Sequence, residues 1–93
     1  MSELQVNMES GPSSPNPNRE LSFGETAVGL AFNPGGDPAV YACKSAYAHI
    51  IDSLNAIRSK TDSAEVKRLC SVAITEAQGA QMWAVKAITW GRS

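Results

Sequence analysis

The segment from about Ser63 to Trp90 constrains the fold most, because it is apolar on more than one face of a helix. Alanine dominates one heptad-spaced stripe, which comprises Cys70, Ala73, Ala77, Ala80, Ala84 and Ala87. Larger apolar side chains lie on the other faces: Leu69, Val72, Ile74, Met82, Trp83, Val85, Ile88 and Trp90. A helix that is apolar on several faces has to be buried on several faces.

A first helix is predicted directly before this segment. Asp37 suits the N-cap position and Pro38 suits the first helical position. Apolar residues then follow at alternating spacings of three and four: Val40, Cys43, Tyr47, Ile50, Leu54 and Ile57. Ile51 widens this stripe. The short link at residues 61–63 joins the two helices, so we expect an antiparallel helical hairpin.

A hairpin of this size has too little core to be stable alone, and one partner helix cannot cover every apolar face of the second helix. We therefore expect an all-α fold in which the hairpin, preceded by a short N-terminal strap or helix, assembles into a homo-oligomer. The domain spans residues 21–93. Within it, residues 21–36 form either a short extended arm or a single helical turn. Residues 1–20 are rich in Pro, Ser and Asn, and are predicted to be a flexible tail or an arm that orders on a neighbouring subunit.

Composition excludes several classes of function. The chain has 93 residues and a formal net charge of −1, so no basic field attracts DNA or RNA polymers. No apolar run reaches the length of a membrane span. Cys43 and Cys70 are expected to be free thiols in a reducing cytoplasm. His49, Asp52 and Glu76 show no spacing typical of a metal site or a catalytic group, so we expect neither an enzyme nor a metalloprotein.

The sequence FNPGGDP, residues 32–38, is the candidate site for a small anion. Gly35 and Gly36 allow close approach of a ligand to the backbone, and the start of a helix favours negative charge. Phe32 is either a core anchor or a stacking surface for a base. Lys44 is either an ordinary surface residue or a phosphate contact.

A second polar group lies on the second helix. Arg68, Ser71, Thr75 and Gln78 share one helical face through spacings of three and four. This face is either a ring of hydrogen-bond donors around a symmetry axis or an ordinary wet stripe between subunits.

These motifs resemble a known family. FNPGGDP, the helix after it and RLCSVAITEAQGAQMWAVKAITW are similar to the small phage proteins that inhibit CBASS defence by sequestering its cyclic-oligonucleotide signals. The related sponges that inhibit Thoeris defence have a similar hairpin. The resemblance covers about residues 22–90, and its most specific parts are residues 71–75 and 81–84.

The resemblance implies a function and an assembly. Such proteins are all-α homo-oligomers, typically hexamers, that act in the cytoplasm of the infected bacterium. They bind cyclic dinucleotides between subunits without cleaving them, some also bind cyclic trinucleotides, and no cofactor is involved. The alternative is a structural or protein-binding hairpin that has no nucleotide ligand.

The resemblance also assigns residues to two sites. The resemblance implies that Phe32 stacks on a base and that Lys44 meets a phosphate. With the loop between them, the cyclic dinucleotide site is expected to comprise Phe32, Asn33, Pro34, Gly35, Gly36 and Lys44. The cyclic trinucleotide site is expected to comprise Arg68, Ser71 and Thr75. Many members carry Tyr-His-Pro where this chain carries Phe-Asn-Pro, so the aromatic ring is kept while the phenol hydroxyl and the imidazole are not.

Overall fold

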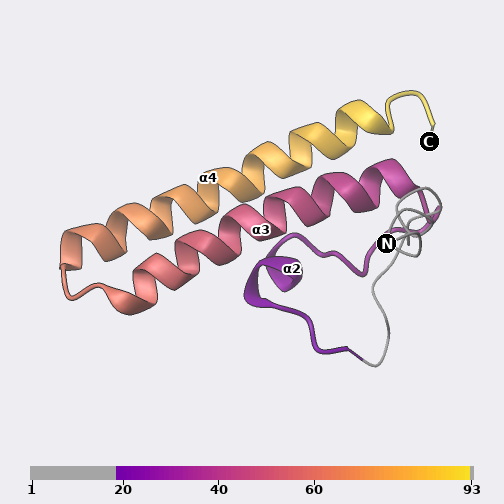
Figure 1. Cartoon of the computed structure of the whole chain (residues 1–93). Coiled ribbons are helices and arrows are strands. Elements are labelled where there is room, and N and C mark those ends of the chain that lie inside the picture. Colours follow the sequence, from indigo (N-terminus) through magenta and orange to yellow (C-terminus); the bar gives the residue numbers. More distant parts are fainter. Residues whose placement is uncertain (1–18, 93) are drawn as a thin grey trace, which may run out of the picture.

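A computed structural model describes residues 19–92, which contain three helices and no strands. Helix α2 spans Phe23–Ala27, α3 spans Pro38–Lys60 and α4 spans Ala64–Ile88. The two long helices run antiparallel and side by side, and α2 packs on α3 (Figure 1). The predicted all-α hairpin is confirmed. Of the predicted tail, residues 1–18 lie outside the described part of the chain.

Local sequence signals set the helix boundaries. The Asp37 carboxylate accepts a hydrogen bond of 2.8 Å from the Ala39 amide, and Pro38 occupies the first turn of α3. The Ser63 hydroxyl accepts a hydrogen bond of 3.2 Å from the Val66 amide at the start of α4. These caps fix where each helix begins, at Pro38 and at Ala64.

The buried face of α3 differs from the expected heptad seam. Its buried residues are Val40, Lys44, Ala48 and Ile51, whereas Ile50 and Ile57 are half exposed. The buried stripe includes a lysine, whose aliphatic stem can occupy an apolar position. A pattern built from apolar residues alone therefore located this face only in part: it included Val40 and Ile51, which are buried, but not Lys44 or Ala48.

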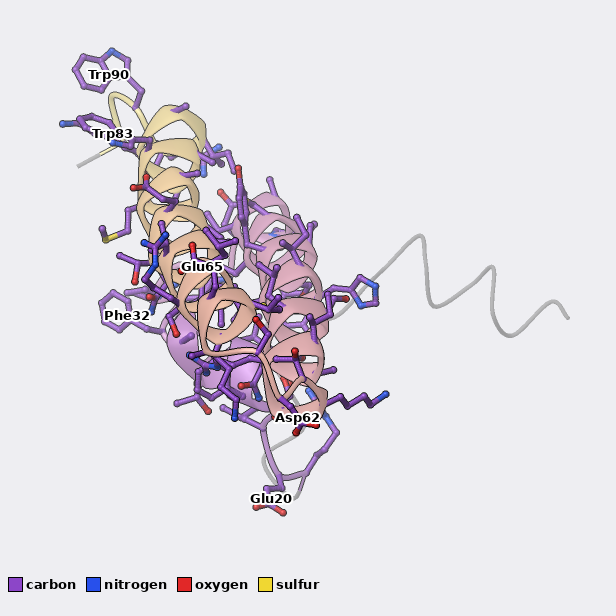
Figure 2. The ribbon with its side chains drawn as sticks, turned by 90° about the vertical axis from the view of Figure 1, so that its left-hand side faces the viewer. Glu20, Phe32, Asp62, Glu65, Trp83 and Trp90 are labelled. Carbon is purple, nitrogen blue, oxygen red and sulfur yellow. The ribbon has the colours of Figure 1, made fainter. Side chains whose placement is uncertain are left out.

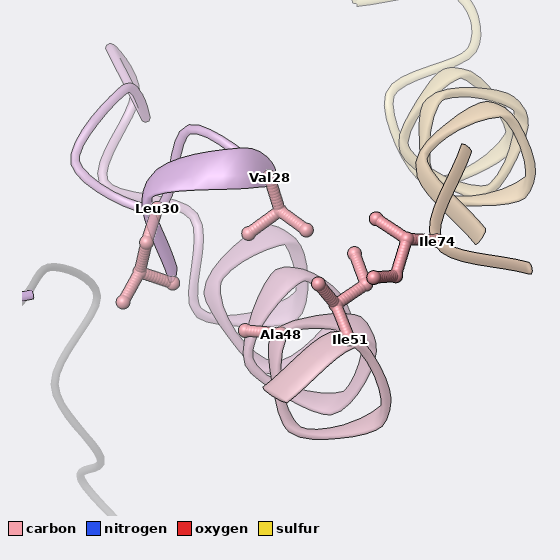
Figure 3. Close-up of a cluster of buried hydrophobic side chains, with 5 residues drawn as sticks. All are labelled: Val28, Leu30, Ala48, Ile51 and Ile74. Atoms are coloured by element: carbon pink, nitrogen blue, oxygen red, sulfur yellow. The ribbon is translucent and has the colours of Figure 1, made fainter. Parts of the chain in front are cut away.

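The core forms where all three segments meet. Ile51 of α3 and Ile74 of α4 point toward each other, with Val28 above them (Figure 3). Leu30, in the segment after α2, is completely buried, and Ala48 of α3 is buried in the same cluster. The short N-terminal segment thus contributes core residues and is an integral part of the fold.

Residues 21–36 contain a single helical turn rather than an extended arm, and α3 holds this turn closely. The Asp52 carboxylate accepts hydrogen bonds of 2.6 Å from the Ser22 hydroxyl and 2.6 Å from the Gly24 amide. A Cβ atom on Gly24 would lie only 2.1 Å from the Ala48 carbonyl oxygen. Glu25 completes a capping box with Ser22. This close packing fixes the position of the loop that follows α2.

Several large apolar side chains of α4 stay exposed within the single chain. Trp83 is 72% exposed, and Trp90, which follows the end of α4, is 76% exposed; both project outward at this end of the hairpin (Figure 2). Leu69, Val72 and Met82 are also exposed. An apolar surface of this kind is typical of a protein–protein contact, and it supports the expectation of a homo-oligomer.

None of the helices in the described range has the length and hydropathy of a membrane span.

Candidate functional site

A cavity of about 590 Å³ lies between residues 32–37, the first turns of α3 and the end of α4. We call it the loop cavity. It is lined by Phe32, Asn33, Pro34, Gly35, Asp37, Val40, Lys44, Val85, Thr89 and Arg92. Five of the six residues expected to bind a cyclic dinucleotide therefore meet there. Gly36 belongs to the same loop but does not line the cavity.

The ring of Phe32 is exposed at the edge of the loop cavity. The side chain is 72% accessible and projects away from the ribbon (Figure 2), so Phe32 is not an anchor of the chain's own core. Its amide donates a hydrogen bond of 2.9 Å to the Gly29 carbonyl, and Gly29 has a positive φ of 65°. An exposed aromatic face held by a tight turn is suited to stacking on a flat ligand.

Lys44 is a buried cation and not an ordinary surface residue. The side chain is only 6% exposed, and its ammonium donates hydrogen bonds to the carbonyls of Gly29, at 3.0 Å, and Phe32, at 2.5 Å. The nitrogen also lies 5.5 Å from the centroid of the Phe32 ring. Burial lowers the pKa of Lys44 from its ordinary value. The lysine therefore anchors residues 29–32, which we call the anchor turn, and leaves one of its three N–H donors for other contacts.

The loop after Phe32 is closed by its own side chains. The Asn33 amide group donates to the Asp37 carbonyl at 3.0 Å and accepts from the Asp37 amide at 3.2 Å. The Gly36 amide donates to the Asn33 carbonyl at 2.9 Å, and Gly36 has a positive φ of 62°. Asn33 and Gly36 thus shape the loop, while Pro34 and Gly35 form its surface on the cavity.

The end of α4 supplies a wall that was not predicted from the sequence. Val85, Thr89 and Arg92 line the loop cavity, and the Arg92 guanidinium forms an ion pair with the Asp37 carboxylate. Because the hairpin turns at residues 61–63, residues near 85 lie opposite Val40 at the start of α3. The antiparallel pairing was the signal that could have identified these residues.

The charged groups of the loop cavity are two cations and one carboxylate. A hydrogen bond from the Ala39 amide and then the Arg92 guanidinium hold the pKa of Asp37 below its usual range. Val40 and Val85 supply apolar wall. Residues 19–92 contain no cluster of His, Cys, Asp or Glu that could hold a metal ion. The arrangement suits a small ligand that is flat, partly apolar and anionic.

Comparison with protein-family models finds a match to the Acb2/Tad1 hairpin domain over residues 25–89. The chain belongs to the Acb2/Tad1 hairpin family. This family sequesters cyclic nucleotide signals, and its hairpin is a ligand-binding domain rather than an enzyme. No curated protein and no solved structure matches the chain. The resemblance inferred from the sequence is thereby confirmed at the level of the family.

The second group of expected residues lies elsewhere on the Acb2/Tad1 hairpin. Arg68 is exposed and pairs with Glu65 on its own helix, with a shortest N–O distance of 2.6 Å. The Ser71 hydroxyl accepts a hydrogen bond of 2.9 Å from Arg58, and Thr75 is exposed. None of Arg68, Ser71 and Thr75 lines the loop cavity.

Gln78 does not belong to this second group, because its side chain contacts α2. Its amide donates a hydrogen bond of 3.2 Å to the Ala27 carbonyl, so the side chain braces α4 against α2. The polar face expected from the sequence is therefore reduced to Arg68, Ser71 and Thr75, which we call the outer face of α4.

Proposed function

We propose that this protein binds cyclic dinucleotides in the loop cavity and sequesters them as a phage counter-defence protein in the cytoplasm of the infected bacterium. One observation carries the proposal: the exposed ring of Phe32 lies beside the buried ammonium of Lys44 at the edge of a cavity. A nucleobase needs a flat partner and a phosphodiester needs a donor. The site offers both within a few ångströms.

The size of the site agrees with a ligand of this class. A volume of about 590 Å³ falls within the range of roughly 300–1,000 Å³ that is usual for small-molecule sites. The walls combine apolar side chains with a few polar groups, as expected for a ligand that has both bases and phosphates.

The contacts of the charged groups favour holding the ligand over cleaving it. The Lys44 ammonium is hydrogen-bonded to two carbonyls, and the Asp37 carboxylate accepts a hydrogen bond from the Ala39 amide. A general base needs a free lone pair within reach of the proton that it removes. These partners reduce the availability of both groups for proton transfer.

The proposal includes assembly into a homo-oligomer, with a hexamer as the expected form. Exposed Trp83 and Trp90, together with the other apolar residues of α4, supply a surface that a second copy can cover. Light scattering should give the mass of an oligomer at micromolar concentration. A monomeric mass would contradict this part of the proposal.

The function is tested by thermal unfolding of the purified chain with a panel of cyclic dinucleotides and cyclic trinucleotides. Ligand that binds only the folded state raises the melting temperature by mass action. At least one cyclic dinucleotide should do so, and it should be recovered intact after the protein is removed by heat. A flat response to the whole panel would instead favour a structural or protein-binding hairpin. Linearised product would show that the ligand is cleaved.

A further inference from the structure

Arg92 lies on the loop cavity but outside the segment that matches the family, which ends at residue 89. It follows Gly91, whose positive φ of 81° turns the chain back after α4. The Arg92 amide donates a hydrogen bond of 3.0 Å to the Thr89 carbonyl, which closes this turn. The turn places the guanidinium against the loop that begins α3.

The ion pair of Arg92 with Asp37 is of a kind that breaks easily. The Arg92 side chain is 58% exposed, and ion pairs in contact with water are weak. One of its five N–H donors reaches Asp37, so most of its hydrogen-bonding capacity is still available. Asp37 also keeps a second partner, the Ala39 amide at 2.8 Å, whenever Arg92 moves away.

Lys44 alone is a limited partner for a doubly charged ligand. Two of its three donors are occupied by the carbonyls of the anchor turn. A cyclic dinucleotide carries two phosphodiesters, each with one negative charge. Within the described residues, Arg92 is the other cation that lines the loop cavity.

We propose that Arg92 is a ligand-binding residue that leaves Asp37 for a phosphate of the bound cyclic dinucleotide. The inference rests on the proposed function and adds to it the second cation of the site. The planar guanidinium donates two parallel hydrogen bonds to one phosphate, which a lysine cannot do. Asp37 holds Arg92 beside the cavity when no ligand is bound, and competes with the ligand for it.

The test is the affinity of four variants for cyclic di-AMP, cyclic di-GMP and cyclic GMP–AMP, measured by calorimetry. Arg92→Gln should weaken the binding that the wild type shows by about tenfold, and Arg92→Lys should restore part of it. Asp37→Asn keeps an N-cap residue but removes the competing charge, so it should tighten binding by about twofold or more. Arg19→Gln is the control, because it removes another exposed ion pair, with Glu25, and changes the net charge equally. Its affinity should equal that of the wild type.

Arg92→Gln and Asp37→Asn are expected to change the affinity in opposite directions, and this distinguishes a ligand contact from an ion pair that only holds the loop in place. If the ion pair only holds the loop in place, Arg92→Gln and Asp37→Asn weaken binding to the same degree, and the inference is wrong. If the wild type binds a dinucleotide and Arg92→Gln binds it with the same affinity, the inference is wrong and the proposed function still stands. A wild type that binds none of the three probes overturns the proposed function, and this inference with it.

Discussion

The loop cavity and the outer face of α4 both carry polar residues that the sequence assigns to ligands, but they are built differently. In the cavity, Lys44 is buried and held by two backbone carbonyls. On α4, the side chain of Arg68 is 61% exposed and is held by Glu65 one turn away. The residues of the first site are therefore brought together by contacts within one chain. The second can enclose a ligand only if other copies of the chain supply the remaining walls.

This difference predicts that the cavity depends on the packing of α2, whereas the outer face of α4 does not. Gly24→Ala should have the largest effect, because its Cβ would lie 2.1 Å from a backbone oxygen of α3. We expect a loss of about 3 kcal/mol in the free energy of unfolding and a loss of dinucleotide binding. Urea unfolding at one fixed protein concentration measures the first, and calorimetry the second.

Gly79→Ala is the matched control within α4. Nothing lies within 4 Å of the position of its Cβ, so the helix should gain about 0.5–1 kcal/mol. If Gly24→Ala were as stable as Gly79→Ala, α2 would not be packed on α3 as described.

Replacing one cation of each site, Lys44 in the loop cavity and Arg68 on the outer face of α4, by methionine sharpens the comparison further. Lys44→Met leaves the carbonyls of the anchor turn without their donor, which should cost about 2–3 kcal/mol of stability and weaken dinucleotide binding at least tenfold. Arg68→Met removes an exposed pair and should leave the melting temperature unchanged. Equal stability of the two variants would mean that Lys44 does not hold the anchor turn in place.

Phe32 separates ligand binding from folding. Because Phe32 is 72% exposed, Phe32→Ala should hardly change the stability of the protein. Loss of a stacked base should nevertheless weaken dinucleotide binding by about 1–3 kcal/mol, and Phe32→Tyr should restore it. Calorimetry of the two variants measures both effects, and an Ala variant with full affinity would exclude stacking on this ring.

The smallest effect is expected from deletion of residues 1–18. The residues that line the loop cavity all lie between 32 and 92. The composition of the deleted segment predicts a flexible tail. Affinity and oligomer mass should both stay within error of the wild type. A marked change in either would favour the alternative, an arm that orders on a neighbouring subunit.

Local signals made the hairpin predictable. The N-cap at Asp37, the proline after it and the short link at residues 61–63 each act within a few residues of the boundary that they set. The glycine-rich loop was recognised for the same reason. The family resemblance then supplied the roles of Phe32 and Lys44.

Contacts between distant residues were not predictable in this way. The Gly24–Asp52 hydrogen bond joins residues 28 positions apart, and the Asp37–Arg92 pair joins residues 55 positions apart. The burial of Lys44 was not predictable either, because a sequence does not show that a lysine lies under the carbonyls of a distant segment of its own chain. Each of these contacts depends on how α2 and α4 pack on α3.

The most direct test of the central claim is a crystal structure of the protein with a bound cyclic dinucleotide. The account predicts one base stacked on Phe32 and a phosphate within hydrogen-bond distance of the Lys44 ammonium. Arg68 should make no contact with the ligand. A dinucleotide bound at the outer face of α4, with the loop cavity empty, would contradict it.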